Sequence, residues 1–371
     1  MTIYELILTL DYELPVNTRP NIMDYIIKPT NNLLGICNAF GIKLTVMAEI
    51  GELWAFEKFE NINFTEYLGY DAAAAIRKQL IEAVKLGHDV QLHLHPQWLS
   101  AKWGQDEWQL DYSKYRLADL DYHEMLDVFR SAKKYLEDLL CPYCDDYSCI
   151  GFRAGNWNTQ PSGNYLKALY KAGLKSDTSV FKWGWANKSS AYMDYRDAYS
   201  NVLPWVASWD DINSRSEDKG LLEFPIYAEP ASIFGMLTLK RLRMARNYLA
   251  EDRAIAQEVR NHRREHVSTN GKLLNQISKL FRTYPKKFDF CKLTSSEMLR
   301  MMANIKKRFN TSGPKHTVPV VMIGHSKEMS SFYELNTFLE EVKKEFGDSV
   351  HFSTYRDLVK RYIENPNLLP D

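Results

Sequence analysis

The sequence predicts an α/β fold in which strands, most of them parallel, are joined by helices. Short apolar runs alternate with stretches in which apolar residues recur every three or four positions. Gly41 and Gly87 follow two of the helical stretches, where a left-handed residue commonly ends a helix. No internal repeat, low-complexity segment or Gly/Ser linker divides the 371 residues, so we expect one domain over 1–371. This periodicity leaves open whether the sheet closes into a barrel.

The β-α order continues along most of the chain. Apolar runs predict strands at Ile3–Leu10, Ile42–Ala48, Val90–Leu94, Cys149–Arg153, Leu174–Ser176, Leu221–Tyr227 and Val318–Ile323. Helical periodicity predicts helices at Pro29–Phe40, Asp71–Leu86, Tyr122–Leu140, Pro161–Ala172, Ser295–Arg308, Phe332–Phe346 and Thr354–Ile363. The basic, helix-prone stretch from 232 to 285 predicts a helical insertion, whose charges either grip an acidic ligand or form a solvated helix face.

The amino-acid composition indicates a globular protein and argues against nucleic-acid-binding and membrane-spanning classes. Hydrophobic residues make up 45% of the chain, which is ample for a sizeable core. Lys+Arg and Asp+Glu are equal at 47 each, which argues against a nucleic-acid partner. No uncharged run approaches the roughly 20 residues that span a bilayer. An acid at Glu5, where a signal peptide would be positively charged, leads us to expect a cytoplasmic protein.

Three of the five cysteines, Cys141, Cys144 and Cys149, lie in one short segment. This spacing suits a structural zinc or redox site, but no second Cys-x-x-Cys pair completes four ligands. Reduced structural or surface thiols are the alternative.

Acid and imidazole side chains follow two of the expected strands. Asp11 and Glu13 come after the first strand, and His93 and His95 lie at the end of the third. Alternate residues of a strand share a face, so each pair presents two groups to one side. Two carboxylates repel each other unless a cation lies between them, and two imidazoles suit zinc or a neighbouring transition metal. The two pairs together predict a divalent metal site, although an acidic turn and a structural histidine pair would explain each segment alone.

Further candidates for chemistry lie at other strand ends. His325 follows the last strand, where it is either a general acid for a leaving amine or a cap of the next helix. Arg153 ends the fourth strand, where a fixed cation would keep a catalytic carboxylate ionised. Trp98 and Trp157 lie near strand ends, where their rings either stack on a sugar or belong to the core.

Taken in order, these segments resemble the polysaccharide deacetylases of the NodB-homology type, carbohydrate esterase family four. The family's first two motifs, Thr-Phe-Asp-Asp and Gly-His-Glu-Ile-Gly-x-His, are similar to residues 8–13 and 87–93. Segments 151–157, 176–179 and 323–325 resemble its later motifs. The resemblance implies an irregular (β/α)7-type barrel, the glycoside hydrolase–deacetylase fold. The His-x-His-Pro run at 93–96 is similar to a WbmS-like subgroup found with surface-polysaccharide biosynthesis genes.

The resemblance also implies roles for individual residues. Asp11 would be the general base, steadied by Arg153. His325 would protonate the departing sugar amine, oriented by Asp177. A divalent metal, with zinc the expected ion, would be held by Glu13, His93 and His95. Substrate contacts would come from Trp98, Asn156 and Trp157.

The chain departs from the family pattern at two positions. Tyr12 stands where the family has its ligand aspartate, so Glu13 must replace it. Gln97 stands where the family has its second ligand histidine, so His95 must serve in its place. Both replacements concern the metal site on which the expected chemistry depends.

The leading functional hypothesis is a metal-dependent N-deacetylase that acts on an acetamido sugar or a surface-polysaccharide precursor. A second hypothesis keeps the metal and changes the substrate to a small cyclic or linear amide. A third is a catalytically lapsed protein that binds saccharide through its tryptophans. The oligomeric state is left open.

Overall fold

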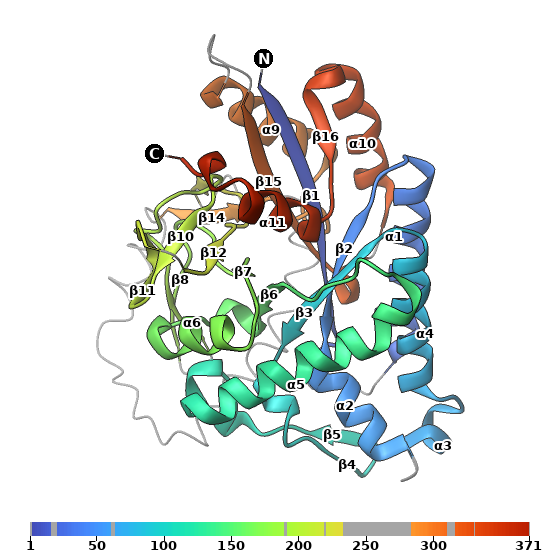
Figure 1. Cartoon of the computed structure of the whole chain (residues 1–371). Coiled ribbons are helices and arrows are strands. Elements are labelled where there is room, and N and C mark those ends of the chain that lie inside the picture. Colours follow the sequence, from blue (N-terminus) through green and yellow to red (C-terminus); the bar gives the residue numbers. More distant parts are fainter. Residues whose placement is uncertain are drawn as a thin grey trace, which may run out of the picture.

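The computed structural model describes residues 2–15, 21–60, 64–188, 191–218, 220–232, 283–309, 316–329 and 331–370. Its main sheet has the strand order β11-β10-β12-β7-β6-β3-β2-β1-β15, and β16 also pairs with β1 (Figure 1). The strands are β1 (Ile3–Tyr12), β2 (Leu44–Glu49), β3 (Asp89–Leu94), β6 (Gly151–Ala154), β7 (Ser176–Asp177), β10 (Trp205–Ser208), β11 (Asp211–Arg215), β12 (Leu222–Glu223), β15 (Thr317–His325) and β16 (Val350–Phe352). Strands from both ends of the described chain therefore meet in one sheet.

The sheet is parallel from β15 through to β12 and curls back on itself. The segment after β12 returns to β15, where Ile226 forms a parallel bridge with Val321. The backbone N–H of Tyr227 then donates to the Val321 carbonyl at 3.0 Å. This closure confirms the irregular barrel that the sequence resemblance implied.

Helices cover the outside of the barrel. They are α1 (Lys28–Ala39), α2 (Ile50–Phe59), α3 (Thr65–Leu68), α4 (Ala72–Lys85), α5 (Tyr122–Leu140), α6 (Ser162–Lys171), α9 (Ser295–Phe309), α10 (Tyr333–Phe346) and α11 (Tyr355–Glu364). Figure 1 shows α1, α4 and α10 along the same side of the molecule. Helix α5 begins after Asp121, whose side chain accepts from the Glu124 N–H, and its buried residues recur every three or four positions.

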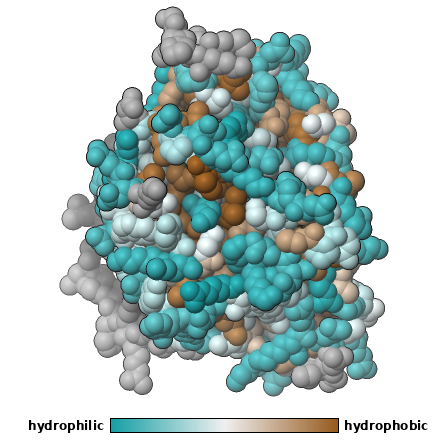
Figure 2. Space-filling view, viewed as in Figure 1, coloured by the Kyte–Doolittle hydropathy of each residue, from teal (hydrophilic) through white to brown (hydrophobic). Residues whose placement is uncertain are grey.

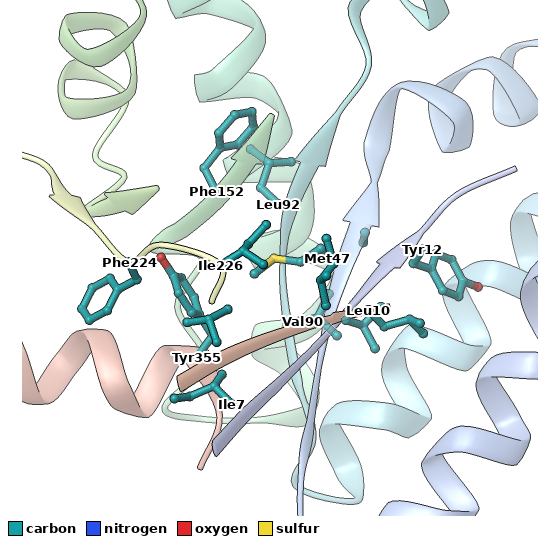
Figure 3. Packing of buried hydrophobic residues seen from close by; sticks show 14 of the residues in the cluster. Ile7, Leu10, Tyr12, Met47, Val90, Leu92, Phe152, Phe224, Ile226 and Tyr355 are labelled. Atoms are coloured by element: carbon teal, nitrogen blue, oxygen red, sulfur yellow. The ribbon is translucent and has the colours of Figure 1, made fainter. Parts of the chain in front are cut away.

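The core fills the barrel and reaches its covering helices. All ten residues of β1 are buried, as expected for a parallel strand covered on both faces. Figure 3 shows Tyr355 of α11 beside Ile7 and Ile226 within this core. The start of α11 covers the amino ends of two strands, because the Tyr355 N–H donates to Thr45 Oγ1 and the Arg356 N–H to Asp89 Oδ2. The carboxyl ends of the strands are thus the ones available for a site.

Outside the insertion, the structure has the predicted helices and strands in the predicted order and adds helices α2 and α3 and strands β10, β11 and β16. The described residues also form three small two-stranded antiparallel sheets. They are β4 (Lys102–Gly104) with β5 (Glu107–Gln109), β8 (Trp185–Lys188) with β9 (Ala191–Asp194), and β13 (Ala228–Ala231) with β14 (Tyr284–Lys287). The predicted helical insertion at 232–285 lies almost wholly outside the described residues, and its described end belongs to β14. The three clustered cysteines are free thiols, and Cys149 is buried.

The face of the molecule shown in Figure 2 is largely polar, with hydrophobic side chains gathered near its middle. No helix in the described part of the chain has both the length and the apolar character needed to cross a membrane.

Candidate active site

Most of the candidate residues, but not Arg153, Asp177 or Trp98, line a cavity of about 330 Å³ at the carboxyl ends of β1, β3 and β15. The parallel pairing of β1 with β15 places Asp11 directly opposite His325. The pairing of β3 with β6 likewise places His93 opposite Arg153. Residues that are far apart in sequence are therefore aligned by the register of one sheet.

Glu13, His93 and His95 point at one another across the cavity floor. The Glu13 Oε2 atom lies 2.6 Å from His95 Nε2 and 3.3 Å from His93 Nε2. One ligating atom from each of the three lies within 4.8 Å of the others, and all three side chains are buried. The acids and imidazoles that the sequence analysis paired thus converge.

The hydrogen bonding of His93 favours a metal ligand. Its Nδ1 lies 2.8 Å from the Arg153 carbonyl oxygen, which only accepts, so Nδ1 carries the proton. In the neutral ring the lone pair of Nε2 then faces the Glu13 carboxylate, so either a second proton on Nε2 or a metal ion has to lie between them. Their 3.3 Å separation is close to the roughly 3.3 Å edge expected for ligand atoms about 2.0–2.1 Å from a tetrahedral zinc ion. The 2.6 Å between His95 Nε2 and Glu13 Oε2 is a hydrogen-bond distance, so these two atoms would have to move apart to share an ion. The donor types fit a divalent metal.

The orientation of the Gln97 amide decides which nitrogen of His95 carries the proton. Its Nε2 lies 3.1 Å from His95 Nδ1, while its buried Oε1 has no hydrogen-bond partner among the described residues. The amide oxygen and nitrogen are interchangeable by a half-turn of the side chain. After that turn Oε1 accepts from a proton on His95 Nδ1, which leaves His95 Nε2 free as a ligand.

Asp11 lies beside the proposed ligands and has different partners. Its Oδ1 accepts from Arg153 Nη1 at 2.6 Å, and its Oδ2 lies 3.5 Å from His325 Nε2. Arg153 is wholly buried and also donates from Nε to the Thr178 carbonyl oxygen. Burial would raise the pKa of Asp11, but the Arg153 guanidinium and the nearby imidazoles outweigh it and lower that pKa. Asp11 is therefore a fixed, ionised carboxylate.

Lys327 forms an ion pair with Glu13 and stabilises its negative charge. The sequence analysis did not select Lys327 as a site residue. Lys327 Nζ lies 2.9 Å from Glu13 Oε1. Burial alone would raise the pKa of Glu13, but this ammonium and the two imidazoles hold it well below its usual range. Two further buried acids, Glu49 and Glu52, have pKa values raised well above normal by burial and by neighbouring carboxylates. Glu13 is thus the ionised member of this acidic group.

His325 has a carboxylate neighbour that the sequence analysis also missed. Glu328 Oε2 lies 3.4 Å from His325 Nδ1, and Lys292 Nζ lies 2.8 Å from the same oxygen. The structure gives Asp177 other partners, because its Oδ1 accepts from the hydroxyls of Tyr165 and Ser179. The expected orientation of His325 by Asp177 is therefore not supported by the contacts. In the sequence, the only sign of this contact is that Glu328 follows His325 by three positions.

Two of the three expected substrate residues line the cavity. Asn156 and Trp157 lie at its wall, and both have positive φ angles, 53° and 54°. Such backbone strain in non-glycine residues is common at functional sites. Trp98, by contrast, is 4% exposed and packs edge-on against Phe56 and Trp108 in the core. Its predicted sugar contact is not supported, because core packing already uses its ring.

No protein-family model and no curated protein matches the sequence. Among solved structures, a Mycobacterium smegmatis protein assigned as a polysaccharide deacetylase matches with 12% identity and a TM-score of 0.47, covering 99% of this chain and 92% of that chain. A 4-α-glucanotransferase of Thermococcus litoralis matches with 14% identity and a TM-score of 0.50, covering 97% of this chain and 41% of that chain. A PuuE allantoinase matches with 12% identity and a TM-score of 0.45, covering 98% of this chain and 91% of that chain.

The chain has the glycoside hydrolase–deacetylase fold. At 14% identity the likeness to the glucanotransferase shows the fold alone, because one barrel supports many reactions. In this glycoside hydrolase–deacetylase barrel, the side chains at the carboxyl ends of the strands indicate which reaction the protein can catalyse.

Proposed function

We propose that the protein is a metal-dependent N-deacetylase of the polysaccharide deacetylase superfamily, acting on an acetamido sugar. The observation that carries the proposal is the convergence of Glu13, His93 and His95 beside an ionised Asp11 that is not part of the ligand set. A carboxylate next to a metal site, but held by a buried guanidinium, suits a general base.

The roles follow from the positions of the side chains. A divalent cation held by Glu13, His93 and His95 would polarise the amide carbonyl and acidify a water molecule. Asp11 takes the proton of the attacking water, and Arg153 keeps that carboxylate oriented. His325 Nε2 lies 3.5 Å from Asp11 Oδ2, the carboxylate oxygen that Arg153 does not bind. His325 gives a proton to the departing amine. Base and acid thus lie next to each other at the wall of one cavity.

The cavity fits a small saccharide unit. A volume of about 330 Å³ lies at the lower end of the roughly 300–1,000 Å³ range of small-molecule sites. The ring of Trp157 borders this space; Lys287 Nζ covers one face, 3.1 Å from the ring centroid, so the opposite face would meet the C–H groups of a sugar. The Asn156 side chain beside it carries an amide for hydroxyl or acetamido groups. The substrate we propose is an acetamido sugar within a cytoplasmic surface-polysaccharide precursor, as in the WbmS-like subgroup.

Zinc is the metal we propose. Two imidazole nitrogens and one carboxylate oxygen form a three-ligand set that leaves a fourth position open, the arrangement of catalytic zinc sites. The same donors accept other first-row metals, so the metal bound by the purified protein has to be measured.

The test combines metal analysis with turnover. The purified protein should contain one divalent metal per chain and release acetate from N-acetylhexosamine oligomers. Asp11→Asn should abolish turnover and leave metal content nearly unchanged, because the hydrogen bond of Asp11 is to Arg153. Asp24→Asn, which changes an exposed acid in an ion pair with Lys28, is the matched control.

Three outcomes would contradict the proposal. Loss of metal and turnover together in Asp11→Asn would make Asp11 a ligand. Turnover of small cyclic amides in place of acetamido sugars would favour the second hypothesis. Saccharide binding by a protein with no metal and no turnover would favour a lapsed site.

A further inference from the structure

We propose that Glu328 is the positioning residue of His325, and that Lys292 and Asp289 hold Glu328 in place. The inference rests on the proposed function in that His325 is the general acid. It assigns to Glu328 the part that the sequence resemblance implied for Asp177.

Local backbone geometry brings Glu328 to His325. Strand β15 ends at His325, and residues Ser326–Glu328 form a single 3-10 turn. Such a helix has three residues per turn, so side chains three positions apart lie on one side. Glu328 Oε2 consequently lies 3.4 Å from His325 Nδ1, and both side chains are buried.

Lys292 and Asp289 fix the carboxylate from the opposite side. The Asp289 Oδ1 atom accepts from the backbone N–H groups of Cys291 and Lys292, which holds this turn in shape. Lys292 Nζ then lies 3.5 Å from Asp289 Oδ2 and 2.8 Å from Glu328 Oε2. The side chains thus form a row of alternating charge that ends at the imidazole.

This row determines which nitrogen of His325 faces the substrate. A carboxylate only accepts, so it favours the tautomer with the proton on Nδ1. Nε2 then points to Asp11, 3.5 Å away, and into the cavity. A proton on Nε2 faces Asp11 and the cavity, so that proton is the one to be donated. The 3.4 Å separation is an ion-pair distance, and neither His325 Nδ1 nor Glu328 Oε2 makes a hydrogen bond among the described residues; such pairs are often loose before substrate binds.

The same residues also admit a second interpretation. Asp289, His325 and Glu328 form a group whose ligating atoms lie within 4.8 Å of one another, as a metal site would require. The Lys292 ammonium, however, already lies between the two carboxylates at 2.8 and 3.5 Å. A divalent ion would have to displace that charge, so we assign the cationic role to Lys292.

The first test does not depend on activity. In protein labelled with ¹⁵N-histidine, nitrogen shifts report the tautomer of His325, whose signal is assigned by its loss in His325→Gln. The wild type should carry the Nδ1–H tautomer. Glu328→Leu should lose it, because the acceptor is gone, whereas Glu328→Gln should retain it through the amide oxygen. An unchanged tautomer in Glu328→Leu, or a change in Asp177→Asn instead, would overturn the proposal.

The second test asks whether the negative charge of Glu328 matters for turnover, or only the size of its side chain. Once a substrate is turned over, Glu328→Gln should lower kcat about tenfold or more with KM nearly unchanged, because the stabilising charge is lost. Glu328→Asp should recover part of the rate. Two metal ions per chain, with one absent in Glu328→Leu, would show that Glu328 is a ligand and refute the positioning role. If no substrate is turned over, the proposed function fails while the tautomer result still stands.

Discussion

The ion pair between Arg153 and Asp11 should contribute strongly to folding as well as to the site. Both side chains are almost fully buried, with 0% and 3% exposed, and their atoms are 2.6 Å apart. Arg153→Met fills a similar volume but leaves the Asp11 carboxylate buried without its cation. Removing one partner of a buried pair costs about 3–5 kcal/mol in the free energy of unfolding. We therefore expect Arg153→Met to lose about that much stability at pH 7.

The sign of the pH dependence follows from the pKa of Asp11. In the wild type this pKa is lowered, so the stabilisation is present above the ordinary aspartate value of about 3.9 and is lost as pH falls through the folded-state value. In Arg153→Met, burial without the guanidinium raises the pKa, so the variant gains stability as pH falls through that raised value. The deficit relative to wild type should narrow between pH 7 and pH 4.

Urea unfolding followed by tryptophan fluorescence at several pH values measures this difference. Lys28→Met is the matched control, because Lys28 and Asp24 are also 2.6 Å apart but are 64% and 53% exposed. Its free energy of unfolding should equal that of wild type within error, since exposed pairs contribute little. An Arg153→Met protein as stable as wild type at pH 7 would refute the reasoning.

Three further predictions concern the metal and a buried histidine. Gly155→Ala would place a Cβ 2.6 Å from the His95 ring, so metal binding measured by calorimetry should weaken about 10- to 100-fold, while Gly35→Ala, with open space at its Cβ, should bind normally. Chelation should lower the melting temperature, and zinc at a hundredfold excess over Kd should restore about 2.7 kcal/mol; an unchanged melting temperature would count against a structural contribution of the metal. Burial lowers the pKa of His88 to about 4, so the unfolded chain binds a proton first as pH falls, and stability should decrease between about pH 6.5 and 4. His88→Gln should reduce that decrease, measured by the urea midpoint at each pH, and an identical slope in both proteins would contradict the assignment.

Local sequence signals predicted much of the framework. Helix α5 has the predicted bounds, Tyr122–Leu140, because an N-capping aspartate and a regular apolar spacing agree. The alternation of Asp11 with Glu13 and of His93 with His95 correctly indicated two pairs at strand ends, since side chains two apart share a face of a strand.

Other parts of the site depended on tertiary contacts. Lys327 and Glu328 follow His325 closely, yet their contacts depend on where β1 and the turn at Asp289 lie in space. Trp98 was expected to contact substrate, but an aromatic residue near a strand end packs in the core just as readily.

The sequence by itself determined the order of helices and strands and the chemical types of the residues at the strand ends, because both follow from short-range periodicity and side-chain identity. Only the tertiary structure decided which of those residues meet. The register of β15 on β1 sets His325 opposite Asp11 across more than three hundred residues of chain, and no local pattern specifies a pairing at that separation.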